Sequence, residues 1–243
     1  MHVSPLLLLT TLTSLSLVTA HGKVAVVQGD AGGNGTALGI IGGIVPGYGP
    51  NDQTEVDTTV FKRVRIATDG LGETTRDGEN KAGCLSETMV QSGNVLPQVS
   101  ADNGSISGTF HIVTTDGAGP ISAIIDTGAT GKFSQGVEAT VLTDVPGKKG
   151  NIKTNGEVPR SLSTLSLFKR GAENVNRDFP FQIQVPAGTN CTGSVAGQKN
   201  VCFMKIANKN KAGPFGGVIA FQITSSNGSV QASVIKKAKR FSS

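Results

Sequence analysis

The chain has 243 residues, among them 33 glycines, one tyrosine and no tryptophan. Its 22 lysines and arginines exceed its 17 aspartates and glutamates by five, and the one basic block is the tail Lys236-Lys237-Ala238-Lys239-Arg240. This mild excess does not favour nucleic acid as a partner, whereas it suits a protein that meets acidic surfaces. No apolar run after residue 20 approaches the roughly 20 residues that a membrane span needs, so no span is expected.

An apolar run rich in Leu, Ser and Thr occupies residues 5–20 and ends in Val18-Thr19-Ala20. Small residues at the last and third-last positions predict signal-peptide cleavage after Ala20. We therefore expect residues 1–20 to be removed and residues 21–243 to form one secreted domain, in which 236–243 is a basic flexible tail. The mature protein is expected to be extracellular and monomeric.

The cysteines and the glycosylation triplets agree with an oxidising, secretory environment. Asn-x-Ser/Thr triplets, each an acceptor for N-linked glycan, occur at Asn34, Asn103, Asn190 and Asn227. Of the three cysteines, Cys191 and Cys202 would close a short loop and leave Cys84 over, and either of the other two pairings remains open. No Cys-x-x-Cys spacing exists, which argues against a structural zinc site.

Short strand-like runs separated by Gly, Asn, Asp and Pro dominate the chain, and no long window shows helical periodicity. Spaced strands of this kind predict an all-β fold, an antiparallel β-sandwich of immunoglobulin or fibronectin type. Residues 31–58 and 148–167 are expected to be long loops, the first of them Gly-rich and functional. The predicted strands are 24–28, 60–66, 105–114, 121–125, 137–142, 179–185, 201–206, 218–224 and 230–235.

Cleavage after Ala20 would leave two histidines, His21 and His111. As the first mature residue, His21 would offer both its α-amino nitrogen and an imidazole nitrogen. His111 lies in the strand-like run 105–114, and if Phe110 and Ile112 face the core, His111 faces the other way, outside the core. Two imidazoles and an amine form a three-nitrogen ligand set that suits Cu(II). The competing interpretation is a chance histidine on a strand.

An N-terminal histidine, a later strand histidine and the run GPFGGVIAFQIT at 213–224 resemble lytic polysaccharide monooxygenases. The resemblance implies a copper histidine brace at His21 and His111, with Phe215 on the axial side of the metal. It also implies that the copper receives electrons from an electron donor and activates dioxygen or peroxide to break a polysaccharide. Phe at the axial position is similar to the bacterial chitin- and cellulose-active members.

In that superfamily, side chains around the metal ligands steer the oxygen species. Gln222 and Glu138 are candidates for this role, because their strands are expected nearby, although a solvated position is the simpler interpretation for each.

A closer resemblance covers most of the mature chain. The run His111–Asp116 followed by Gly117-Ala118-Gly119-Pro120, together with Gly213-Pro214-Phe215-Gly216-Gly217, resembles secreted fungal virulence proteins of the appressorium-specific MAS/GEGH type. That family is linked to infection structures. The chain departs from these patterns in having few cysteines, Gly213 where cellulose-active enzymes keep Gln, and no additional histidine near the metal. With Tyr48 as its one tyrosine, it also lacks a flat aromatic platform for crystalline cellulose.

Three other enzyme patterns fail on the sequence. Asp126-Thr127-Gly128 matches the aspartic-protease loop, but it occurs once, and we interpret Asp126 as a turn residue. The glycines after residue 29 are followed by no helix of the kind a dinucleotide site needs. There is no Gly-x-Ser-x-Gly elbow for a serine hydrolase.

The leading hypothesis is a secreted virulence protein with a copper site that oxidises chitin or a plant-wall glycan. The alternative is a non-catalytic secreted effector or wall protein that binds glycan, host protein or copper. Both expect a polysaccharide or host surface as partner.

Overall fold

The computed structural model describes residues 21–40, 57–74, 78–160 and 172–224, and it is almost entirely β. The predicted strand 230–235, the signal peptide, the basic tail, Tyr48 and Asn227 lie outside the described residues. The helical segments are η1 (Ala82–Cys84), α2 (Leu85–Ser92) and η2 (Phe133–Gln135). The strands are β1 (Gly22–Gly29), β2 (Gly32–Gly35), β3 (Thr59–Val60), β4 (Glu73–Thr74), β5 (Gly78–Glu79), β6 (Gln98–Ser100), β7 (Ser105–Thr114), β8 (Ile121–Asp126), β9 (Val137–Thr143), β10 (Asn174–Gln184), β11 (Gly193–Val195), β12 (Gln198–Asn208) and β13 (Phe215–Thr224).

The strands form a closed barrel, not the two-sheet sandwich that their spacing predicts. Hydrogen-bonded neighbours follow the order β12-β8-β9-β10-β7-β1-β13, and β13 pairs again with β12. Closure satisfies the edge groups that a sandwich leaves open, and the short strands β2 to β6 and β11 attach outside this circuit. A sandwich and a barrel share the same alternating pattern, so strand spacing alone does not separate them.

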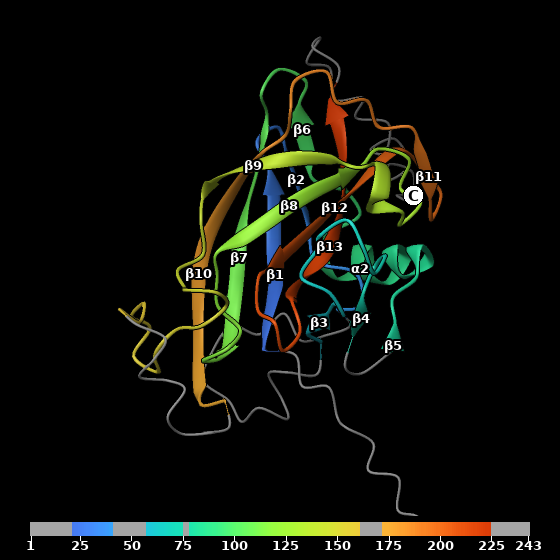
Figure 1. The fold of residues 1–243 in the computed structure, drawn as a ribbon. Helices are drawn as coiled ribbons and strands as arrows, with labels where there is room; N and C mark the ends of the chain where they lie inside the picture. The colour runs from blue at the N-terminus through green and yellow to red at the C-terminus, as the bar shows by residue number, and fades with distance from the viewer. Residues whose placement is uncertain (1–20, 41–56, 75–77, 161–171, 225–243) are drawn as a thin grey trace, which may run out of the picture.

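The circuit has seven strands, and this odd number has a geometric consequence. Directions cannot alternate all the way round, so one neighbouring pair must be parallel. That pair is β1 and β13, with Lys23 opposite Gly216, while the other pairs in the circuit are antiparallel. Both arrows therefore start at the same, lower end of the barrel in Figure 1. The start of β1 thus lies beside the start of β13.

The barrel interior is an apolar core built from inward-facing residues of every strand in the circuit. Phe110 and Ile112 of β7 lie in it, as the alternation predicts, together with Val24, Phe181 and Phe221. Gly22 has no space for a side chain there, because a Cβ would lie 2.7 Å from the Phe110 ring.

A second apolar cluster covers the outer face of β8, β12 and β13. Phe203 and Val218 point outward into it, and Leu85 and Met89 of α2 pack against them. Figure 1 shows α2 beside β13 on this side of the barrel. The helix α2 was not predicted, because its eight residues are too few to reveal a 3.6-residue period.

Seven of the predicted strands coincide closely with β1, β7, β8, β9, β10, β12 and β13, whereas the predicted strand 60–66 shrinks to Thr59–Val60. None of the helices in the described part of the chain has the length and apolar character that a bilayer span requires.

Candidate functional site

His21 lies just before β1, and the loop after β7 holds its ring. Its carbonyl oxygen accepts a hydrogen bond from the Val113 amide at 2.9 Å. Nδ1 bonds to the Thr114 hydroxyl and lies 3.4 Å from a carboxylate oxygen of Asp116. Because Thr114 donates its own proton to Asp116 at 2.7 Å, Nδ1 of His21 is the donor to Thr114. Burial lowers the pKa of His21, and the negative charge of Asp116 opposes that shift.

Phe215 is brought to His21 by the parallel pairing of β1 and β13. The two ring centroids are 5.1 Å apart and the rings are nearly perpendicular, at 86°, an edge-to-face contact. The Phe215 ring is buried and packs against Val60 of β3, which pairs with it across the sheet. The Asn208 side chain accepts the Phe215 amide hydrogen at 3.0 Å and so fixes where β13 begins.

His111 points away from the barrel core, as the alternation predicts, yet its side chain has no exposed surface. His111 belongs to no apolar core cluster, but the outer face of the barrel is covered at this position. Nδ1 lies 2.7 Å from a carboxylate oxygen of Asp178, its neighbour across β7 and β10. Nε2 has no well-aligned hydrogen bond with the described residues, although hydrogen bonding to the Asn176 side chain raises the pKa of His111.

Burial is the larger effect and lowers the pKa of His111, so the ring is neutral. Nδ1–H of the neutral ring then donates a hydrogen bond to the Asp178 carboxylate, and the lone pair resides on Nε2. This is the tautomer in which a carboxylate presents an imidazole to a metal ion.

Lys23 is the unexpected member of the site. It is 1% exposed and lies opposite His111 across β1 and β7. The negative charges of Asp57 and Asp178 interact with its ammonium group. Burial lowers the pKa of Lys23, and the two carboxylates oppose that shift. The outer face thus carries a row of charged and polar groups in the order Asp178, His111 and Lys23.

Sequence reasoning missed Lys23 and Asp178. Each lies one residue before a predicted strand, 24–28 or 179–185, at a position that alternates with an inward-facing apolar residue. That these strands flank the His111 strand is shown only by the pairing in the structure.

The two predicted histidines therefore lie on neighbouring strands at the same end of the barrel. The Val113 amide that bonds the His21 carbonyl is two residues from His111. Within the described residues, no group of three or more His, Cys, Asp or Glu side chains is placed to hold a metal ion. A metal here would need a further ligand, and the α-amino nitrogen of a processed His21 is the one that the predicted cleavage supplies.

Several other predicted residues lie elsewhere. Cys191 and Cys202 form a disulfide with 5.0 Å between their Cα atoms, and Cys84 is a free, half-buried thiol. Gln222 bonds to Gln98 and to the Lys199 carbonyl at 2.8 and 2.7 Å, seven residues along β13 from Phe215, and so does not approach His21.

Further along the barrel wall, Glu138 is exposed on β9. The Asp126 carboxylate accepts the amide hydrogens of Gly128, Thr130 and Gly131, which is the role of a turn residue. Among the glycosylation triplets, the described asparagines Asn34, Asn103 and Asn190 are all exposed.

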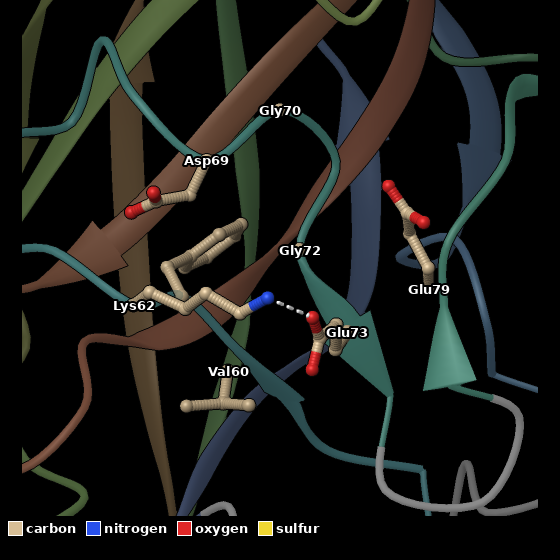
Figure 2. A pocket seen from close by; sticks show the side chains of 8 residues that line it. Val60, Lys62, Asp69, Gly70, Gly72, Glu73 and Glu79 are labelled. Carbon is tan, nitrogen blue, oxygen red and sulfur yellow. Dashed lines mark ion pairs between the residues drawn. The ribbon is translucent and has the colours of Figure 1, made fainter.

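A cavity of about 200 Å³ lies next to Val60, on the segment that leads from β3 to β5. Figure 2 shows carboxylates of Asp69, Glu73 and Glu79 around it, with Lys62 paired to Glu73 at 2.5 Å. The lining residues are Val60, Phe61, Lys62, Asp69, Gly70, Gly72, Glu73 and Glu79. No residue of this cavity was singled out from the sequence.

Comparison with known proteins identifies a family that matches most of the chain. Residues 19–216 match the family described as Egh16-like virulence factor. The chain is 34% identical over 221 residues to the appressoria-specific virulence factor GAS1 of Pyricularia oryzae, an alignment that covers 90% of this chain and 78% of GAS1. It is 35% identical over 153 residues to GAS2 of the same fungus, covering 63% of this chain but less than half, 46%, of GAS2. No solved structure matches the chain.

Proposed function

Because the chain belongs to the Egh16-like virulence-factor family, we propose that it is a secreted virulence protein that works outside the fungal cell, at a host or wall surface. The names of GAS1 and GAS2 point to appressoria, the infection structures of fungi. The apolar leader that ends at Ala20 and the three exposed glycosylation asparagines support secretion. The family match begins at residue 19, next to the expected cleavage point.

The finer part of the proposal is a copper site formed by His21 and His111. The observation that carries it is the arrangement of His111, whose Nδ1 is held by the Asp178 carboxylate and whose buried Nε2 lacks a well-aligned hydrogen bond. A buried polar atom without a partner costs about 1–3 kcal/mol, and a metal ion at that atom removes the cost. The imidazoles of His21 and His111 and the His21 amine would supply three nitrogen ligands, a set that copper accepts.

Two features of the site oppose copper binding in the arrangement that the structure shows. A histidine that chelates through its own amine uses Nδ1, the ring nitrogen nearer the backbone, and here Nδ1 of His21 faces Thr114. The ammonium of Lys23 also lies near His111 and repels a cation. Binding therefore requires the His21 ring to turn away from Thr114.

Bound copper would supply one-electron redox chemistry, which in the monooxygenases that the sequence resembles breaks polysaccharide chains. In this chain Asp178 would orient His111, and the Phe215 ring would restrict the His21 ring. Thr114 and Asp116 would hold the His21 ring when no metal is bound. Chitin or a plant-wall glycan is the proposed substrate.

A specific observation favours a second candidate, a non-catalytic copper- or glycan-binding protein. The His111 ring has no exposed surface, so a polysaccharide cannot reach the metal from that side. The chain also lacks tryptophan and the aromatic platform on which flat glycans stack.

Copper titration of the secreted protein tests the site. Mass spectrometry should give His21 as the mature N-terminus, and calorimetry should show tight binding of one copper ion. We expect His111→Ala to weaken binding at least about 100-fold and Asp178→Asn about 10-fold, since partners of a metal ligand contribute roughly 10–100-fold. A matched control carries one extra glycine before His21, which moves the amine and should abolish tight binding.

Unchanged copper affinity in His111→Ala or in the extended protein contradicts the site. Tight copper without oxidised oligosaccharides from chitin or plant glucans would contradict the enzyme and leave the binding protein as the function.

A further inference from the structure

A cluster of exposed lysines lies on two loops at the end of the barrel that holds His21. Lys148 and Lys149 are on the loop after β9, and Lys209 and Lys211 are on the loop between β12 and β13; we name these four residues the basic surface. Among the described residues none of the four forms an ion pair, so their charges are not neutralised locally.

Asn210 holds the two loops together. Its side-chain amide donates to the carbonyls of Asp116 and Gly150, the latter at 3.4 Å, and the residue is almost fully buried. The contact is close, because a Cβ on Gly150 would lie 2.5 Å from the Asn210 Cβ, and Gly150 has a φ of +83°. Asn210 sits between Lys209 and Lys211, and Gly150 follows Lys149. The lysines therefore surround a fixed, buried contact and are not scattered over independent loops.

The same loop leads into the candidate site. The side chain of Asn208 accepts the amide hydrogens of both Asn210 and Phe215, at 3.2 and 3.0 Å. Asp116, whose carbonyl Asn210 binds, has its carboxylate near His21. In Figure 1 the yellow loop after β9 lies on the side of the barrel away from α2.

Further cations extend the basic surface. The Lys148 ammonium donates to the Arg160 carbonyl at 2.8 Å, and the Arg177 guanidinium lies within 2.8 Å of the position that a Cβ on Gly156 would take. The nearby Glu157 is paired with Lys153 at 2.9 Å. Net positive charge thus runs across the loops 148–160 and 209–211.

We propose that the basic surface binds a carboxylated polysaccharide, a polyuronic acid. Spaced ammonium groups on two loops match the repeated single charges of an extended polyanion, and electrostatic complementarity of this kind sets partner choice. Residues 145–160 and 209–212 contain no aromatic side chain, so the stacking that single-stranded nucleic acid needs and the aromatic anchors of membrane-surface segments are both absent. The idea that this polymer is also the substrate of the site next to His21 rests on the proposed function. Binding of the polymer to the basic surface requires no copper.

The test uses the mature full-length protein and polygalacturonate, with fully methyl-esterified polygalacturonate as the uncharged control polymer. The variant Lys149→Gln/Lys209→Gln/Lys211→Gln removes three charges from the basic surface. The matched variant Lys81→Gln/Lys132→Gln/Lys199→Gln removes three exposed charges elsewhere, with Lys199 at the opposite end of β12. Thermal unfolding verifies that both variants are folded.

We expect the protein to bind polygalacturonate and not the esterified polymer. The basic-surface variant should lose affinity about tenfold or more, since each lysine near an anionic surface contributes on the order of fivefold. The matched variant should bind like the wild type. Binding should also weaken as the salt concentration rises from about 0.1 M to about 1 M, because the Debye screening length then falls from ~10 to ~3 Å.

Equal loss in both triple variants, or none in the basic-surface variant, overturns the proposal. So does tighter binding to phosphatidylserine vesicles or RNA that depends on the same three lysines. If the copper site fails and polygalacturonate binding stands, only the proposed function falls.

Discussion

Lys205 shows at the residue scale how a single charge can organise a loop. It lies in the apolar strand β12, 1% exposed, and its ammonium lies 3.8 Å from the centroid of the Phe61 ring. It donates to the carbonyls of Thr68 and Gly70, the second at 3.3 Å, and so ties the segment that lines the cavity to the barrel wall. Burial lowers the pKa of Lys205 to about 8, and Asp69 opposes that shift.

The lowered pKa fixes the sign of a pH effect. Between pH 8 and 10.5 the unfolded chain keeps the lysine proton while the folded chain loses it. The unfolded state then binds more protons, so the free energy of unfolding rises with pH through this window. At neutral pH the charge costs about 3 kcal/mol, at about 1.4 kcal/mol for each pKa unit.

We therefore predict that Lys205→Met removes this pH dependence. The wild type should gain about 3 kcal/mol relative to the variant between neutral pH and pH 10.5, the interval set by its lowered pKa. Urea unfolding of both proteins at several pH values measures the difference, and Lys132→Met at an exposed position is the control. A difference that stays constant with pH would show that folding does not change the pKa of Lys205.

At the scale of elements, the parallel pairing of β1 and β13 decides what lies near His21. A hairpin would place the start of one strand beside the end of the next, whereas parallel strands place both starts side by side. His21 and Phe215 meet for this reason, although 194 positions separate them. The loop after β7 also approaches His21. Gly117 permits this approach, because a Cβ there would lie 1.6 Å from the His21 carbonyl oxygen.

Gly117→Ala should displace the start of β1 and lower the free energy of unfolding by about 1–3 kcal/mol, the usual cost of overpacking. The His21 ring signals in an NMR spectrum should shift with it, because the displaced carbonyl belongs to the same residue. Gly83→Ala is the control, since its Cβ would meet nothing within 4 Å. Unshifted His21 signals in Gly117→Ala would mean that this contact does not position the residue.

At the scale of the whole molecule, closure produces one interior that every strand of the circuit shares. Phe110 lies at the centre of a row in this interior, opposite Val24 on one side and Phe179 on the other. The outer face is buried by α2 and its neighbours along β12 and β13, while β9 stays largely exposed.

Phe110→Ala should therefore lower the free energy of unfolding by about 3–5 kcal/mol, through lost burial and the cavity left behind. Leu142→Ala on β9, at a side chain that is 52% exposed, should change it by no more than about 0.5 kcal/mol. Guanidinium unfolding measures both. Similar losses in the two variants would mean that β9 does not present Leu142 to solvent.

The candidate site was only partly predictable. Alternation along β7 put His111 on the face opposite Phe110, and the resemblance singled out His21 and Phe215, which the structure brings into contact. The partner of His111, Asp178, is 67 residues away, and no local pattern links the two.

The sequence by itself determined where most strands run and which side chains point inward, and it predicts which histidine a signal peptidase would expose. Those features follow from a two-residue period and from short motifs, which are local. The tertiary structure decided that the strands close into a barrel, that β1 and β13 run in parallel, and that the outer face over His111 is covered. Each of these depends on pairing between distant segments, and many pairings satisfy the same alternation. Only closure of the hydrogen-bond circuit around one core selects among them.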